Sequence, residues 1–108
     1  MKYEVLVLAE AEDDLVELYD FIAAEDAPSK AEALLVQLEK ACASLDRFPE
    51  RGRIPPELRR IGVSLYREIL LGPYRIVYRI GSRSVHIYAV LDGRRDLTQT
   101  LERRLIGS

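Results

Sequence analysis

The pattern of hydrophobic and polar residues starts with a short apolar run. Residues 3–8, YEVLVL, are apolar on both alternations, which predicts a strand buried on both faces. Between Ala9 and Glu25 the apolar positions recur at helical spacing, which predicts an amphipathic helix. Its apolar stripe consists of Ala11, Leu15, Leu18, Tyr19 and Ile22. Its opposite face is acidic and consists of Glu10, Asp13, Asp14 and Glu17.

A second amphipathic helix is predicted after a short break at residues 25–29, EDAPS. Asp26 or Ser29 is expected to cap this helix, and Pro28 is tolerated only near its start. The helix is expected to run to about Arg47. Two such helices joined by a short link form an antiparallel hairpin. The stripe of the second helix consists of Ala31, Leu34, Leu35, Leu38, Ala41, Cys42 and Leu45.

The periodic pattern breaks over residues 49–64, PERGRIPPELRRIGVS. Pro49, Pro55 and Pro56 exclude a continuous helix or a central strand here. We expect a long basic connection with one helical turn near residues 57–60. Loops of this length in a small domain are often functional.

Three strands are predicted after this connection. Residues 65–71, LYREILL, end at the turn signal Gly72-Pro73, and residues 74–80 and 85–91 follow. We expect one apolar face to pack on the helix hairpin and the other face to be partly open to solvent. Alternation places on the apolar face Tyr74, Ile76, Tyr78, Ile80, Val85, Ile87, Ala89 and Leu91. It places on the other face Arg75, Val77, Arg79, His86, Tyr88 and Val90.

The fold class that follows is α+β, in one domain of residues 1–108. Its order is an N-terminal strand, an antiparallel helix hairpin, a three-stranded antiparallel meander and a short C-terminal helix. We expect the N-terminal strand to pair with the last hairpin and complete one sheet. Asp96 is expected to cap the closing helix, in which Leu97, Leu101 and Leu105 are spaced by four.

The charges of the chain are unevenly divided. Residues 1–50 hold 4 Lys or Arg and 13 Asp or Glu, whereas residues 51–108 hold 12 Arg and 5 Asp or Glu. This split indicates an anionic partner for the second half, either nucleic acid or an acidic protein segment. The alternative is a fold with one acidic and one basic face and no such partner.

The chain has one cysteine, Cys42, and one histidine, His86. This excludes a disulfide within the chain, and the usual zinc ligand sets cannot be assembled. The first apolar run is too short for a signal-peptide core, and no run approaches membrane-spanning length. We therefore expect a cytoplasmic protein without metal or cofactor.

Four motifs in a fixed order carry a resemblance to a known family. They are FPERGR at residues 48–53, YRE at 66–68, YRIVYR at 74–79 and GRRDL at 93–97. Together they resemble the RelE/ParE superfamily, the toxin components of bacterial type II toxin–antitoxin modules, over nearly the whole chain. The resemblance implies a sheet flanked by a helical hairpin. It also implies a cognate ParD-like antitoxin whose flexible C-terminal segment wraps the toxin.

The superfamily divides into two functional branches. RelE-like members cut mRNA in the ribosome, whereas ParE-like members poison DNA gyrase. The nucleases use basic residues and a tyrosine on the open sheet face. Arg67, Arg75 and Arg95 match three of these positions, but Ile69 and Leu101 stand where a second basic residue and the tyrosine are expected. The resemblance therefore favours a ParE-like gyrase inhibitor that blocks replication and is not itself an enzyme.

The alternative is a RelE-like, metal-independent mRNA endonuclease that acts with the ribosome. Such cleavage needs proton transfer and cations around the phosphate, which His86 with Arg67, Arg75 and Arg95 would supply. A structural role is open for each: His86 hydrogen-bonds a neighbour, and Arg75 pairs across strands with Glu68. Under the favoured interpretation the residues that bind an anionic partner are Arg67, Arg75, Arg79, Arg94 and Arg95.

The helix stripes offer a candidate groove for the antitoxin. Tyr19, Ile22, Leu38 and Leu45 are its expected lining, with core packing as the alternative for each. The arginine-rich half favours an acidic antitoxin segment.

Overall fold

A four-stranded mixed sheet organises the structure, a computed structural model that describes residues 2–107. The strands are β1 (Glu4–Val7), β2 (Arg67–Leu71), β3 (Tyr74–Ile80) and β4 (Ser84–Asp92), in the spatial order β1-β4-β3-β2. Strands β2, β3 and β4 form an antiparallel meander, and β1 pairs with β4 in parallel. The predicted α+β order, with the first strand joined to the last hairpin, is confirmed.

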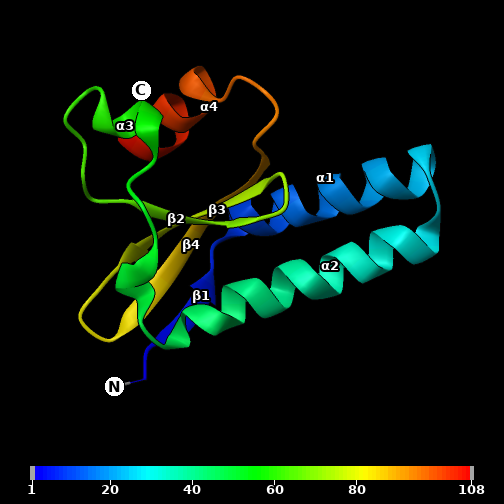
Figure 1. Cartoon of the computed structure of the whole chain (residues 1–108), viewed down its shortest axis with the longest axis horizontal. Helices are drawn as coiled ribbons and strands as arrows, with labels where there is room; N and C mark the ends of the chain where they lie inside the picture. The colour runs from blue at the N-terminus through cyan, green and yellow to red at the C-terminus, as the bar shows by residue number, and fades with distance from the viewer. Residues whose placement is uncertain (1, 108) are drawn as a thin grey trace.

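Two long helices form an antiparallel hairpin on one face of this sheet (Figure 1). They are α1 (Ala9–Glu25) and α2 (Pro28–Ala43), and a 3₁₀ turn (Ser44–Asp46) extends the second. The expected caps are wrong, because α2 starts after Ala27 with Pro28 at its first turn and no side-chain cap. The linked ends of the hairpin project beyond the sheet in Figure 1.

The core between hairpin and sheet uses the predicted stripes. Ala11, Leu15, Leu38, Cys42 and Leu45 pack against strand residues of β3 and β4. Asp14, which was predicted on the exposed acidic face of α1, is buried instead. Its carboxylate accepts a hydrogen bond of 2.9 Å from the backbone N–H of Val90.

A second hydrophobic core covers part of the opposite face of the sheet, and the rest of this face, around the exposed Arg79 and the half-buried His86, is open as predicted. Three short helical segments lie over it: α3 (Pro56–Arg59), α4 (Thr98–Glu102) and the π-helical turn η3 (Arg103–Gly107). The predicted cap is wrong, because Leu97 stands at the N-cap of α4 without a side-chain cap, while Asp96, one residue earlier, accepts a hydrogen bond of 3.1 Å from the N–H of Thr98. The buried members of this core are Leu58, Tyr66, Val77, Ala89, Leu97 and Leu101.

A β-bulge at Tyr88 changes the faces of β4. Val77 pairs with Ala89 and Tyr78 pairs with Ile87, so Tyr88 has no partner on β3. Beyond the bulge the alternation is reversed, and Val90 joins the hairpin core while Ala89 and Leu91 join the second core. The predicted faces of these three residues are therefore wrong.

Strand β1 is an edge strand and is not buried on both faces, contrary to the prediction. Val5 and Val7 are half-buried under the hairpin, whereas Glu4 and Leu6 are exposed. The edge of β1 away from β4 has no partner strand within residues 2–107.

The proline-rich connection is ordered by short turns. A 3₁₀ turn at Pro49–Arg51 precedes α3, which confirms one helical turn near residues 57–60. Arg53 pairs with Glu68 in an isolated antiparallel bridge that extends the β2 edge. None of the helices described is long and apolar enough to cross a bilayer.

Candidate functional site

Arg75 of β3 is the centre of a buried network of charges. Its Nε donates to Glu68 Oε1 at 2.7 Å, and its two terminal nitrogens donate to the carboxylate of Glu57 at 2.7 Å each. Glu68 also accepts from Arg53 Nε at 2.7 Å. The Arg75 side chain is only 8% exposed, so it has little surface left for a partner.

The ion pairs of this network shift the pKa values of Glu57 and Arg75. The hydrogen bonds from Arg75 lower the pKa of Glu57 below its ordinary range. The hydrogen bonds to Glu57, followed by those to Glu68, raise the pKa of Arg75. A bidentate pair, in which two guanidinium nitrogens donate to one carboxylate, is among the strongest interactions that arginine forms. Arg75 therefore stays charged and oriented by the fold itself.

Gly93 explains why a glycine precedes the two arginines of GRRDL. A Cβ on Gly93 would lie 2.8 Å from Arg75 Cδ and 2.8 Å from the carbonyl oxygen of Pro73. The N–H of Gly93 donates to that same carbonyl at 2.7 Å. The turn after β4 therefore packs directly on the Arg75 side chain.

Arg67 and Arg75 lie on opposite faces of the sheet. Arg67 pairs with Tyr78 across β2 and β3, so it lies on the hairpin side, and its guanidinium donates to the carbonyl of Gly52 at 2.8 Å. Glu68 lies on the Arg75 side, because its strand partner is Val77. Arg67 and Arg75 therefore do not form the set of basic residues on one open face that the nuclease alternative requires.

Arg79 and His86 are cross-strand neighbours on the Arg75 side, near the other end of β3. Arg79 is exposed and His86 is half-buried. Arg79 is four positions after Arg75 on the same strand, which corresponds to about 13 Å. Tyr88 is engaged elsewhere, edge-on to the ring of Tyr66 with 5.2 Å between ring centres.

Arg94 and Arg95 are exposed at the turn after β4. Arg94 forms an ion pair of 2.8 Å with Asp92 and lies 6.0 Å from the centre of the Tyr74 ring. Arg95 lines a polar cleft of about 350 Å³ between α1 and the C-terminal segment. Leu101, at the position where a nuclease tyrosine was expected, is fully buried in the second core.

Asp14 and Arg104 form the floor of this polar cleft. Arg104 Nη1 donates to both carboxylate oxygens of Asp14, and Nη2 donates to the carbonyl of Tyr88 at the bulge. Burial raises the pKa of Asp14, and the contacts from Val90 and Arg104 oppose that rise. Periodicity in the sequence gave no signal for this pair, since the two residues come from opposite ends of the chain.

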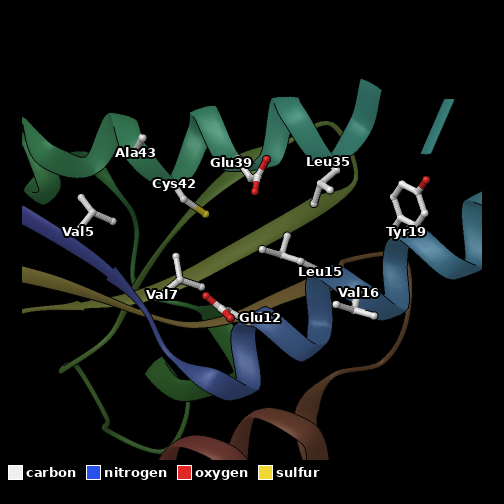
Figure 2. A pocket seen from close by; sticks show the side chains of 10 residues that line it. All are labelled: Val5, Val7, Glu12, Leu15, Val16, Tyr19, Leu35, Glu39, Cys42 and Ala43. Atoms are coloured by element: carbon white, nitrogen blue, oxygen red, sulfur yellow. The ribbon is translucent and has the colours of Figure 1, made fainter. Parts of the chain in front are cut away.

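An apolar groove of about 610 Å³ lies between α1, α2 and β1. Figure 2 shows side chains from all three elements around it, with Glu12 on the α1 wall and Glu39 on the α2 wall. Within residues 2–107 neither carboxylate has an ion-pair partner. The apolar lining consists of Val5, Val7, Leu15, Val16, Tyr19, Leu35, Cys42 and Ala43.

Of the residues predicted to line an antitoxin groove, Tyr19 does line this one. Leu38 and Leu45 are 1% and 0% exposed, so they belong to the core, and their predicted place in the groove lining is wrong. Ile22 is half-buried and lies outside the lining. Cys42 is at the base, and burial raises the pKa of its thiol to about 11, which keeps it neutral and apolar.

Comparison with solved structures identifies the type of fold. The fold is similar to that of a solved chain described as the chromosomal ParDE TA system from P. aeruginosa, with a TM-score of 0.70 and 19% identity. The match covers 82% of this chain and 94% of that chain. No curated protein matches the sequence. The mixed sheet with its helical hairpin is therefore a ParE-like toxin fold.

The family is shown by the sequence itself. Residues 5–97 match the family model described as the ParE toxin of the type II toxin-antitoxin system, parDE. This match spans the sheet from Val5 onward, the hairpin and the GRRDL turn. The chain belongs to the ParE toxin family.

Proposed function

We propose that this ParE-family chain inhibits DNA gyrase, stabilises the cleaved gyrase–DNA complex and so blocks replication in the cytoplasm. The observation that carries the proposal is the burial of Arg75 between Glu57 and Glu68. An arginine that stabilises a phosphate during RNA cleavage has to present free donors to it. Here all three guanidinium nitrogens are already bonded to carboxylates.

The other residues of the nuclease alternative are also apart. Arg67 is on the opposite face from Arg75, and His86 is paired in register with Arg79, far along β4 from Arg95. General acid–base catalysis requires groups within hydrogen-bond reach of one reacting centre. This separation favours a protein-binding toxin over an mRNA endonuclease.

Two of the arginines remain suited to an anionic partner surface. Arg79 and Arg95 are exposed and form no ion pair within the described residues. Arg67 donates to the carbonyl of Gly52 and is half-buried, whereas Arg94 pairs with Asp92 and its side chain is 65% exposed. Arg75 has the smallest part in such a surface because it is almost fully enclosed.

The decisive experiment measures supercoiling by purified gyrase with increasing amounts of the chain. The expected result is loss of supercoiling with accumulation of cleaved DNA, together with an SOS response on expression. The His86→Ala variant is the matched control and should inhibit equally. Normal supercoiling at excess protein, combined with mRNA cleavage that His86→Ala abolishes, would refute the proposal in favour of the ribosomal nuclease.

We also propose that a ParD-like antitoxin neutralises the chain by laying an amphipathic segment in the groove between α1, α2 and β1. Its apolar side chains would cover the Val16 and Tyr19 wall, and helix-in-groove binding of this kind is common. Glu12 and Glu39 favour a lysine or arginine on that segment. This differs from the acidic segment expected from the composition, because the groove lies on the acidic half of the chain.

A further inference from the structure

Phe48 has an unusual backbone conformation for a bulky residue. Its φ and ψ angles are 51° and 51°, in the left-handed region, and among the described residues it is the only non-glycine with a positive φ. Asparagine, aspartate and glycine adopt this region far more readily than phenylalanine does. The ring of Phe48 is nevertheless 76% exposed, so the chain gains almost no buried surface from it.

The segment around Phe48 is held rigidly in place. Arg51 donates to the carbonyls of Arg47 at 2.8 Å and Phe48 at 3.3 Å, and to Ser44 Oγ at 2.7 Å. Pro49, which follows Phe48, is buried, and its carbonyl accepts a hydrogen bond of 2.5 Å from the Tyr78 hydroxyl. These contacts hold the backbone on both sides of Phe48 and so fix where on the fold its exposed ring lies.

A strained backbone that persists on a rigid support is typical of functional positions. Exposed aromatic residues on a well-ordered backbone are also typical of binding hot spots, because little backbone entropy is lost when they dock. Asparagine at this position would fit the backbone better and would remove an exposed apolar ring. The ring is therefore best explained by a contact outside this chain.

The charges near Phe48 indicate the chemistry of that contact. Arg51 is bonded to backbone carbonyls and Arg53 is paired with Glu68, so both guanidinium groups already have partners within the chain. Arg47 is exposed and forms no ion pair within residues 2–107. One free arginine beside one exposed ring fits an apolar protein pocket with a carboxylate at its rim.

Phe48 lies outside the lining of the groove between α1, α2 and β1. It follows the C-terminal end of α2, whereas the link between the helices is at the opposite end of the hairpin (Figure 1). The groove reaches Ala43 at the end of α2, so the two surfaces are neighbours, and antitoxin affinity has to be measured beside potency in the test.

We propose that Phe48 inserts into an apolar, carboxylate-rimmed pocket of the protein that this toxin inhibits, and that it does not contact the antitoxin. The inference rests on the proposed function in one respect, namely that the toxin acts by binding a target protein. It adds the residue that anchors the toxin to that target. Nucleic acid, the antitoxin and a second copy of this chain are the other candidate occupants.

The test compares wild type with Phe48→Asn, which keeps the left-handed backbone and removes the ring. We expect about a 30-fold loss of potency in growth inhibition and in gyrase inhibition, as for other aromatic anchors. Antitoxin affinity should be unchanged, and the melting temperature should be equal or higher because strain is relieved. Phe21→Ala removes another exposed ring, 61% exposed on α1, and should leave potency unchanged.

Specific outcomes overturn the inference. The inference is wrong if Phe48→Asn is as potent as wild type, or if it binds the antitoxin more weakly than wild type does. It is also wrong if wild type binds a DNA oligonucleotide that the variant does not bind, or if wild type forms a dimer that the variant does not form. Failure of the proposed function appears separately, as growth arrest by wild type with normal gyrase activity. In that case the Phe48→Asn comparison is decided in the growth assay alone.

Discussion

Asp14 and Arg104 are 90 positions apart in the sequence and form a buried ion pair, with 2.9 Å between Asp14 Oδ1 and Arg104 Nη1. Both partners also bond to the backbone around the bulge of β4, Asp14 to the N–H of Val90 and Arg104 to the carbonyl of Tyr88. A bulge leaves ladder groups unpaired, and this pair satisfies them. The pair also fixes the C-terminal turn η3 to α1.

Arg104→Met should destabilise the fold by about 3–5 kcal/mol, because it leaves the Asp14 carboxylate buried without its partner. The side chains of the pair are only 11% and 10% exposed. Urea unfolding measures the loss. Arg103→Met is the matched control, since Arg103 is exposed, and it should change the unfolding free energy by less than about 0.5 kcal/mol. Equal effects of the two variants would contradict the role of the pair.

The pair of Glu57 with Arg75 should make stability depend on pH in the acid range. The pKa of Glu57 is lowered in the folded state from 4.5, so the folded state binds protons less readily than the unfolded state. The stabilisation is therefore fully present above pH 4.5 and is lost as the pH falls through the lower, folded pKa. Asp14 acts in the opposite direction, because its folded pKa is raised.

Glu57→Gln isolates this contribution. Near pH 7 the variant should be less stable than wild type by about 2 kcal/mol, because Arg75 loses a charged acceptor but keeps Glu68. The difference should shrink below pH 4.5, and unfolding curves at several pH values measure it. Glu32→Gln, at an exposed position of α2, should differ from wild type by less than about 0.5 kcal/mol at pH 7. A Glu57→Gln difference that grows on acidification would show that the sign is wrong.

Gly52→Ala should be strongly destabilising, by roughly 2–3 kcal/mol. An added Cβ would lie 2.2 Å from the Tyr78 hydroxyl and 2.7 Å from the carbonyl of Glu68, and neither group can move freely. Adding Tyr78→Phe should recover only part of the loss, because the Glu68 carbonyl stays in place. Gly81→Ala is the milder comparison, since its nearest contact is the mobile Ser84 hydroxyl at 3.2 Å. Thermal unfolding of the four proteins tests the order.

Val16→Arg should prevent neutralisation by the antitoxin while leaving growth inhibition intact. Val16 is 59% exposed on the α1 wall of the groove, so a long charged side chain there would fill the space that the antitoxin needs. Co-expression of toxin and antitoxin, with growth as the readout, measures the effect. Val36→Arg is the control, because Val36 is 44% exposed on α2 outside the groove. Normal neutralisation of the Val16→Arg variant would place the antitoxin elsewhere.

The helices could be predicted from the sequence because their period is visible in long segments. The bounds of α1 agree with its apolar stripe, and α2 is offset only at its ends. The bulge could not be predicted, since Ala89, Val90 and Leu91 are all apolar and a reversal of faces leaves no trace in their pattern. The faces of β4 were therefore assigned correctly only before Tyr88.

The second core and the Arg75 network depend on contacts between distant segments. Leu58, Tyr66 and Leu101 come from three separate stretches, each too short for a clear period. Glu57, which accepts two of the three hydrogen bonds from Arg75, is in a four-residue helix inside the proline-rich connection. The motifs identified the family and the important arginine, but only the fold shows that this arginine is already occupied.

The parallel pairing of β1 with β4 has a consequence for the order of folding. Glu4 pairs with Ser84, so the sheet closes only after a loop of about 80 residues has been brought together, and such closure is slow compared with the local β2–β3–β4 meander. Strand β1 should therefore join the sheet last and show little native structure in the transition state. Truncation of the Val5 or Val7 side chain should then speed unfolding more than it slows folding. Because Val5 and Val7 also line the groove, an antitoxin bound there would hold the late-forming strand in place and lengthen the lifetime of the folded toxin.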